Sequence, residues 1–247
     1  MSYPAVERTR VSLFIPCYVD QLMPEVGIAT VQLLEHVGCK VHYDPRQTCC
    51  GQPAFNGGFL DEARAVARHM LDVFHLGDDP IVVPSGSCAT MCKVFFPQLF
   101  EQPAEHDLAN RLAARVWELS DFLVQRLGVD DVGAEFEHAV TFHDGCHGLR
   151  ELHTHESPRR LLSEVRGLRL IEMGEARTCC GFGGTFAVKF APISTAMAEV
   201  KCKSALATGA EYIVSGDPSC LMQIRGYIEK QRLPIKTIHL AEVLNSR

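Results

Sequence analysis

The tetrapeptide Thr-Cys-Cys-Gly occurs twice in this chain, at residues 48–51 and again at residues 178–181. Each copy has one single cysteine upstream and one downstream, namely Cys17 and Cys88 for the first copy and Cys146 and Cys220 for the second. Corresponding cysteines are separated by 129, 130 and 132 residues. This period is longer than that of a solenoid repeat, so the sequence predicts the duplication of a whole small unit.

Each half of the chain has the same predicted order of strands and helices. In the first half, β-rich runs at 11–15, 40–43 and 81–83 alternate with helical patterns at 24–38 and 61–74. In the second half, runs at 139–142, 168–171 and 212–214 alternate with helical patterns at 157–167 and 192–208. Strands that alternate with helices form parallel sheets with right-handed crossovers.

The predicted fold class is therefore α/β, with two duplicated parallel-sheet βαβαβ halves in a pseudo-two-fold relation. The predicted domains are residues 10–128, the first cysteine-rich half, and residues 137–247, the second. The segment from Phe95 to Asp107, and more loosely through Glu137, is expected to link the halves.

The repeated cysteines come directly after predicted strands. The carboxyl ends of parallel strands share one edge of a sheet, and ligands bind at that edge. The cysteines of each half should therefore converge on one metal site. The predicted cofactor and metal ligands are Cys17, Cys49, Cys50 and Cys88 in the first half and Cys146, Cys179, Cys180 and Cys220 in the second.

Thiolate-only sites suit zinc or iron–sulfur clusters. A [4Fe–4S] cluster takes four cysteines, and its size allows neighbouring thiolates to bind different irons. Structural zinc usually uses spaced pairs such as Cys-x-x-Cys, and two adjacent cysteines reach one small ion less easily. The spacing favours two [4Fe–4S] clusters, with zinc in one or both sites as the alternative.

The composition of the chain indicates in which compartment and with which partners we expect it to act. The chain has 247 residues, 47% of them hydrophobic, with a net charge of −6, which gives no reason to expect a nucleic-acid or anionic-membrane partner. No apolar run approaches the roughly 20 residues of a membrane span, and residues 1–10 lack the apolar core of a secretory signal. We expect a cytoplasmic location, where 11 cysteines indicate metal or redox chemistry rather than disulfides.

The cysteine motifs resemble those of a known superfamily, the cysteine-rich CCG domains found in heterodisulfide reductases. The closest resemblance is to the LutA/YkgE/LldE group, the iron–sulfur components of the L-lactate utilisation complex. It extends over nearly the whole chain and rests on residues 15–17, 48–54, 84–88, 143–147, 179–186 and 215–222. The resemblance implies an iron–sulfur electron-transfer subunit of a complex that oxidises L-lactate to pyruvate, with other iron–sulfur and accessory subunits as partners.

Two departures from the wider superfamily limit this inference. The heterodisulfide reductase form ends each motif with Cys-x-x-Cys and thereby supplies a fifth ligand. Gln223 stands at that position in the second half and Met91 in the first, where Cys92 follows one residue later. The chain also lacks the ferredoxin-like run of closely spaced cysteines found in relatives that oxidise glycolate and glycerol 3-phosphate. Electrons would therefore reach it through another subunit.

Several residues and functions stay open. Cys39 and Cys202 are expected to be buried as small hydrophobic residues, and so, less firmly, is Cys92. His143 and His147 flank Cys146 and either tune or ligate a metal site or are ordinary loop residues. No catalytic acid–base pair is evident, and binding of a small-molecule substrate is undecided. The alternative functions are a thiol–disulfide redox catalyst and a zinc-stabilised interaction module.

Overall fold

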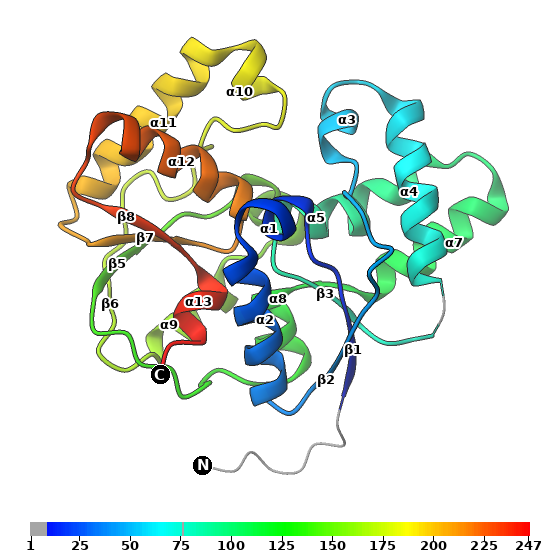
Figure 1. The fold of residues 1–247 in the computed structure, drawn as a ribbon, viewed down its shortest axis with the longest axis horizontal. Helices are drawn as coiled ribbons and strands as arrows, with labels where there is room; N and C mark the ends of the chain where they lie inside the picture. Colours follow the sequence, from blue (N-terminus) through cyan, green and yellow to red (C-terminus); the bar gives the residue numbers. More distant parts are fainter. Residues whose placement is uncertain (1–8, 76) are drawn as a thin grey trace.

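The computed structural model describes residues 9–75 and 77–247, which contain two four-stranded sheets, each of them entirely parallel (Figure 1). The order is β2-β1-β3-β4 in the first sheet and β6-β5-β7-β8 in the second. The strands are β1 (Arg10–Leu13), β2 (Lys40–Tyr43), β3 (Ile81–Val83), β4 (Val116–Glu118), β5 (Ala139–Phe142), β6 (Arg169–Leu170), β7 (Tyr212–Ser215) and β8 (Lys236–His239). The predicted α/β class with duplicated parallel-sheet halves is confirmed.

Helices connect the strands in the same order in both halves. Those of the first half are α1 (Cys17–Leu22), α2 (Pro24–His36), α3 (Gln52–Asn56), α4 (Leu60–Phe74), α5 (Gly86–Thr90), α6 (Phe96–Leu99), α7 (Pro103–Arg115) and α8 (Leu119–Asp121), with π-helical turns η1 (Met91–Phe95) and η2 (Phe122–Arg126). Those of the second half are α9 (Glu156–Ser163), α10 (Phe186–Lys189), α11 (Ala191–Leu206), α12 (Pro218–Gln231) and α13 (Leu240–Leu244), with the π-helical turn η3 (Gly148–Leu152).

Each half has a fourth strand that the sequence pattern did not predict. β4 pairs with β3, where Val82 lies opposite Trp117, and β8 pairs with β7, where Val214 lies opposite Ile238. β4 ends in Glu118 and β8 begins with Lys236, so neither is the uninterrupted apolar run that reveals β3. Each half is therefore a unit of four strands rather than three.

The expectation that Phe95 to Asp107 links the halves is wrong, whereas its looser extension through Glu137 contains the connection that the structure shows. This segment folds into the first half, where Phe96, Leu99 and Phe100 are buried in its core. Pro97 and Pro103 lie in the first turns of α6 and α7, where a missing N–H costs no helical hydrogen bond. The connection between the sheets is shorter and runs from the end of η2 to the start of β5.

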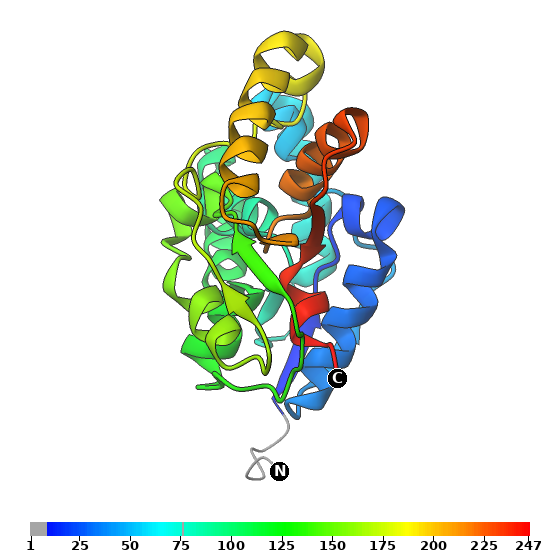
Figure 2. The ribbon, with the colours of Figure 1, turned by 90° about the vertical axis from the view of Figure 1, so that its left-hand side faces the viewer.

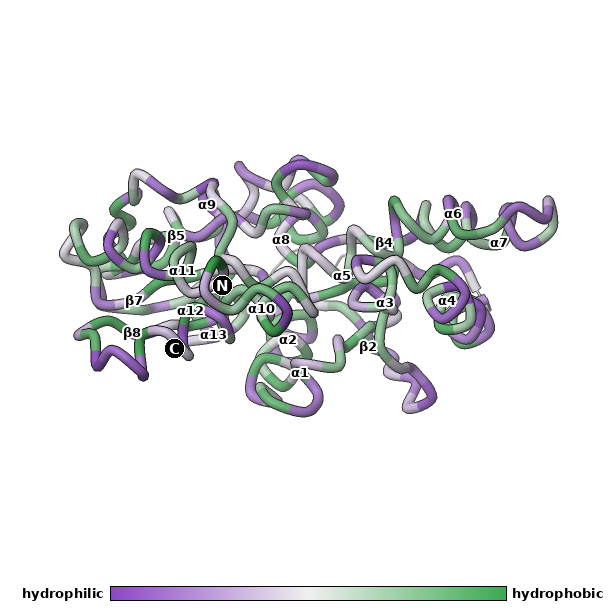
Figure 3. The backbone as a smooth tube through the Cα atoms, turned by 90° about the horizontal axis from the view of Figure 1, so that it is seen from above, coloured by the Kyte–Doolittle hydropathy of each residue, from purple (hydrophilic) through white to green (hydrophobic). Residues whose placement is uncertain are grey.

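The two halves pack against each other through matching elements. α2 of the first half contacts α13 of the second, and α9 contacts α8 and η2 in the same way. The α5–η3 contact likewise has its counterpart in the α1–α12 contact. Figure 3 shows α2 and α8 between the two sheets, where Leu33, Phe122, Leu161 and Leu244 join one continuous core. These reciprocal contacts agree with the pseudo-two-fold relation.

The carboxyl ends of the strands lie on one side of each half. In each sheet the first strand stands between the second and the third, so the connections diverge to opposite sides at that point. Figures 1 and 2 show α10 and the start of α11 projecting beyond this side of the second half. Among the described residues no helix is both long and apolar enough to cross a bilayer. Residues 1–8, part of the stretch examined for a secretory signal, lie outside the described residues.

Candidate metal centres

The four repeated cysteines of the first half form one chain of contacting thiols. Cys17 begins α1, the pair Cys49 and Cys50 follows β2, and Cys88 lies on α5 after β3. The thiol of Cys49 contacts those of Cys17 and Cys50. The sulfur of Cys50 lies 3.4 Å from that of Cys88. The structure thus brings together the residues that sequence spacing placed at this edge.

The second half repeats the arrangement. Cys146 follows β5, the pair Cys179 and Cys180 follows β6, and Cys220 lies in the first turn of α12 after β7. The thiol of Cys179 contacts those of Cys146 and Cys180, and Cys180 contacts Cys220. We refer to the two groups as the first thiol set (Cys17, Cys49, Cys50, Cys88) and the second thiol set (Cys146, Cys179, Cys180, Cys220).

A glycine after each cysteine pair shapes the site. Gly51 and Gly181 have φ angles of 82° and 89°, which a residue with a side chain rarely adopts. Their backbone N–H groups donate to the sulfurs of Cys49 at 3.3 Å and Cys179 at 3.4 Å. A Cβ atom on Gly181 would lie 2.6 Å from the carbonyl oxygen of Ser194. The Cys-Cys-Gly motif therefore turns the backbone so that amide donors face sulfur.

The thiols strongly perturb one another. Hydrogen bonds from Cys17 and Cys50 lower the pKa of Cys49 to about 3, and those from Cys146 and Cys180 lower the pKa of Cys179 to about 2. The pKa of Cys50 is raised, first by its hydrogen bond with Cys49 and then by the one with Cys88. Each set therefore favours one thiolate that accepts hydrogen bonds from its neighbours. Deprotonation of all four requires compensating positive charge, which a bound metal provides.

Each set has a buried and a partly exposed pair of cysteines. Cys50, Cys88, Cys180 and Cys220 are buried, whereas Cys17, Cys49, Cys146 and Cys179 are partly exposed. A pocket over the first thiol set is completed by Phe182, Gly184, Pro218 and Ser219 of the second half. The ring of Tyr18 meets that of Phe182 edge-on, with centroids 5.5 Å apart. The second half therefore forms part of the wall of the first site.

Comparisons with known proteins agree with this geometry. Residues 11–93 and again residues 140–225 match the cysteine-rich domain family CCG. Lactate utilization protein A of Exiguobacterium sp. is 46% identical, with 95% of this chain and 96% of that protein aligned. The protein of the same name from Bacillus subtilis is 44% identical over 96% of this chain and 100% of its own length. This chain belongs to the lactate utilization protein A family.

One solved structure supports the fold of this lactate utilization protein A family member. A hypothetical protein from Helicobacter pylori superposes with a TM-score of 0.66 at 10% sequence identity. The alignment covers 96% of this chain and 48% of that protein, so the chain spans about half the length of that structure. At this identity the likeness concerns the fold alone.

Cys92 lies near the first thiol set. It is 2% exposed, and burial raises its pKa, with further contributions from Cys88 and Cys49. Ile224 occupies the corresponding place in the second half, 132 residues further along the chain. The first half therefore has a fifth buried cysteine in the same core cluster as Cys50 and Cys88, and the corresponding position in the second half has no thiol.

The other two cysteines outside the sets behave as the sequence predicts. Cys39 is 7% exposed in the core shared by the halves, and Cys202 is fully buried under the second sheet. Burial raises the pKa of each thiol to about 11. Both are small buried hydrophobic residues.

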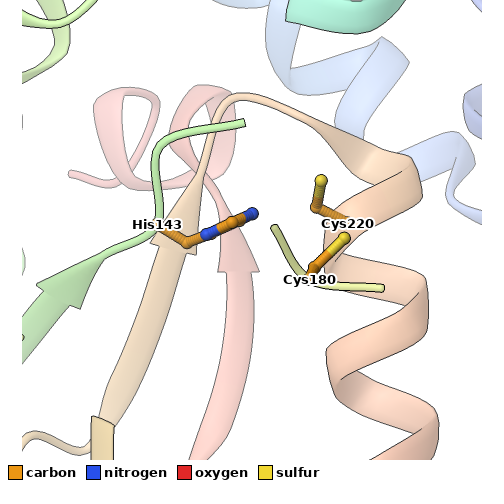
Figure 4. Close-up of side chains that lie close together, drawn as sticks. All are labelled: His143, Cys180 and Cys220. Carbon is orange, nitrogen blue, oxygen red and sulfur yellow. The ribbon is translucent and has the colours of Figure 1, made fainter. Parts of the chain in front are cut away.

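The two histidines near Cys146 have different positions. The Nδ1 of His147 lies 3.1 Å from the side-chain nitrogen of Gln52 in the first half. His143 is fully buried at the end of β5, with a ring nitrogen within 4.8 Å of the sulfurs of Cys180 and Cys220. Figure 4 shows its ring pointing toward these two cysteines. His143 therefore belongs to the second site, and His147 bridges the halves.

Sequence reasoning missed two buried charged residues near the thiol sets. Lys201 is fully buried on α11, although lysine on a helix normally suggests an exposed position. Asp217 is 2% exposed and accepts hydrogen bonds from both halves of the molecule. A signal for Asp217 existed in its position before Pro218, which is typical of a helix N-cap. No comparable signal marks Lys201.

Proposed function

We propose that this chain is an iron–sulfur electron-transfer subunit of a multi-protein oxidoreductase that converts L-lactate to pyruvate. The observation that carries the proposal is the presence of two matched sets of four contacting thiols, each at the carboxyl edge of a parallel sheet. The substrate rests on the relatives named lactate utilization protein A. The proposed location is the cytoplasm.

The donors fit [4Fe–4S] clusters. Cys17, Cys49, Cys50 and Cys88 would hold one, and the second thiol set would hold the other. Amide donors to sulfur are a known means of setting cluster potential, and Gly51 and Gly181 provide them at 3.3 and 3.4 Å. When bound, each cluster supplies a one-electron carrier. The chain contributes ligands, burial and hydrogen bonds.

Partner subunits follow from the chemistry. Oxidation of lactate removes two electrons, and the sequence has no ferredoxin-like cysteine run to pass them on. Each thiol set keeps two partly exposed cysteines, which leave a side open to another redox protein. We therefore propose that other iron–sulfur and accessory subunits of the complex exchange electrons with this chain, while lactate binding to this chain itself stays open.

Metal and sulfide analysis of anaerobically purified protein tests the proposal. Two [4Fe–4S] sites predict about eight irons and eight sulfides per chain, with EPR signals that change on reduction. Cys49→Ser should remove about half of the iron. Cys202→Ser, a matched change at a buried cysteine outside both sets, should leave the iron unchanged. Zinc without sulfide in strictly anaerobic protein would instead identify a zinc-stabilised interaction module.

A second candidate function is thiol–disulfide redox catalysis. Cys92 favours it, because it lies buried in one cluster with Cys50 and Cys88 and could supply a fifth cysteine, as in the heterodisulfide reductase type of site. Steady turnover of a disulfide with a reduced electron donor, lost in Cys92→Ser, would support this candidate. Turnover that persists in Cys92→Ser, or none in the wild-type protein, would oppose it.

A further inference from the structure

The surroundings of the two thiol sets differ even though their cysteines correspond one to one. The glycine of the first Cys-Cys-Gly motif faces Val66 on α4, and the glycine of the second faces Met197 on α11. These two helices therefore correspond with an offset of 131 residues. Lys201 on α11 thus takes the place of Met70 on α4.

His143 differs from its counterpart in the same way. It lies three residues before Cys146, and Phe14 lies three residues before Cys17. Both side chains are fully buried. Phe14 packs in an apolar cluster with Cys50 and Cys88, whereas His143 places an imidazole within 4.8 Å of the sulfurs of Cys180 and Cys220.

Lys201, Asp217 and Asp144 act electrostatically on the imidazole of His143, but none of them forms a hydrogen bond with it. Among residues 9–75 and 77–247, neither of its ring nitrogens has a hydrogen-bond partner. Buried polar groups normally have a hydrogen-bond partner, so a fully buried ring without one indicates a site for a further group next to it. Figure 4 shows the ring directed at Cys180 and Cys220, which places that group at the second thiol set.

Lys201 adds a positive charge on the same side. Its Nζ donates to the carbonyl oxygens of Glu175 and, at 3.3 Å, Ala176. Within the described ranges it forms no salt bridge with a carboxylate. Its charge acts on the thiols of Cys180 and Cys220. Burial lowers the pKa of Lys201, whereas the thiols of Cys180 and Cys220, followed by the carboxylates of Glu175 and Asp144, favour its charged form.

We propose that His143 and Lys201 give the second site a higher reduction potential than the first, so that the second site is where an electron taken up by this chain resides. The inference rests on the proposed function, since it requires both thiol sets to hold clusters. One-electron reduction adds one negative charge to a site that four thiolates already make negative. The ammonium and the ring N–H favour this added charge, and the carboxylate of Asp217, which acts on Cys146 and Cys220, opposes it. Met70 and Phe14 at the first site supply neither a positive charge nor a donor.

An EPR-monitored redox titration of the anaerobically purified protein tests the inference, with dithionite as the electron donor. The wild-type protein should show two reduction steps. In Lys201→Met, which installs the residue of the first half, only the step at higher potential should move to lower potential. At its wild-type midpoint the ratio of reduced to oxidised site should fall about tenfold, which corresponds to about 59 mV for one electron. His143→Phe should move the same step in the same direction.

Lys203→Met is the matched control. Lys203 lies on the same helix, but its side chain is 72% exposed and paired with Glu199, so neither step should move. Lys201→Arg keeps the charge and should keep the wild-type potential. If Lys201→Met lowers iron content, Lys201→Gln, which removes the charge and retains donors, is titrated in its place and should show the same shift.

The outcomes separate this inference from the proposed function. Two clusters of equal potential, or a Lys201→Met titration that moves both steps or neither, would overturn the inference and leave the electron-transfer proposal intact. Absence of iron and sulfide from the wild-type protein would overturn the proposed function, and the inference would fall with it. A shift confined to one step, absent in Lys203→Met, would support both.

Discussion

Asp217 is predicted to hold the two halves together through a single buried carboxylate. Its Oδ1 accepts hydrogen bonds from the backbone N–H of Ser219, at 3.1 Å, and from the hydroxyl of the same residue, at 2.6 Å. Its Oδ2 accepts from the backbone N–H of Ser87, at 2.7 Å, in the first half. One side chain therefore caps α12, which carries Cys220, and also accepts from the first turn of α5, which carries Cys88 and has Ser85 as its own N-cap.

Replacing Asp217 with alanine removes both functions at once. Loss of an N-cap costs about 1 kcal/mol, and leaving the buried N–H of Ser87 without a partner costs about 1–3 kcal/mol. The expected loss of unfolding free energy is therefore about 3 kcal/mol. For a chain of this size 1 kcal/mol lowers the melting temperature by about 2–4 °C, so we expect a fall of roughly 6–12 °C.

Thermal unfolding of anaerobically purified protein, followed by circular dichroism, measures this fall. Asp217→Asn should have an intermediate effect, because its amide oxygen can still cap Ser219 while its NH2 group opposes the N–H of Ser87. Asp72→Ala, at an exposed position on α4, is the control and should change the melting temperature little. A fall in Asp217→Ala no larger than in Asp72→Ala would refute the bridging role.

Two further predictions concern the polar interface and the cysteine turn. Burial, with the charge of Asp121, raises the pKa of Glu118 from 4.5 to about 8. The folded state thus favours the neutral form of Glu118, so the free energy of unfolding should decline as pH rises from about 4.5 to 8. In Glu118→Gln the melting temperature should decline less between pH 5 and 8. Equal declines of melting temperature in the variant and the wild-type protein would contradict this prediction. Gly181→Ala should lower the iron content by about half, because the new Cβ meets Ser194. Gly209 also has a positive φ, but a Cβ atom added there would meet no other atom within 4 Å, so Gly209→Ala should keep its iron. Equal loss of iron in both variants would contradict the steric explanation.

The strand ends and the convergence of the cysteines could be predicted from the sequence because both depend on local patterns. The run at 81–83 is apolar throughout, as expected of a strand buried on both faces, and it matches β3. Parallel pairing then places residues after successive strands at one edge whatever the details of packing. This is why the sequence alone predicts that Cys17, Cys50 and Cys88 lie together.

Tertiary packing determined the structure of two segments that the local sequence pattern did not predict correctly. Phe96 and Phe100 lie in the segment that was expected to link the halves, yet both are buried in the first half because α6 and α7 cover that core. β4 contains Glu118 and is not an uninterrupted apolar run like β3, and it forms as a strand by pairing with the edge of β3. Neither the burial of these phenylalanines nor the strand β4 follows from local secondary-structure propensity, because packing against distant segments overrides it.

The sequence by itself determined that the chain has two equivalent halves, that each is a parallel α/β unit, and that each gathers four cysteines. Only the tertiary structure decided that the two sites are unequal. Residues such as His143, Lys201 and Asp217 occur at positions whose neighbours come from other strands and helices. The burial of a side chain, its hydrogen-bond partners and the charges near it all depend on this three-dimensional neighbourhood. The order of residues along the chain does not specify them.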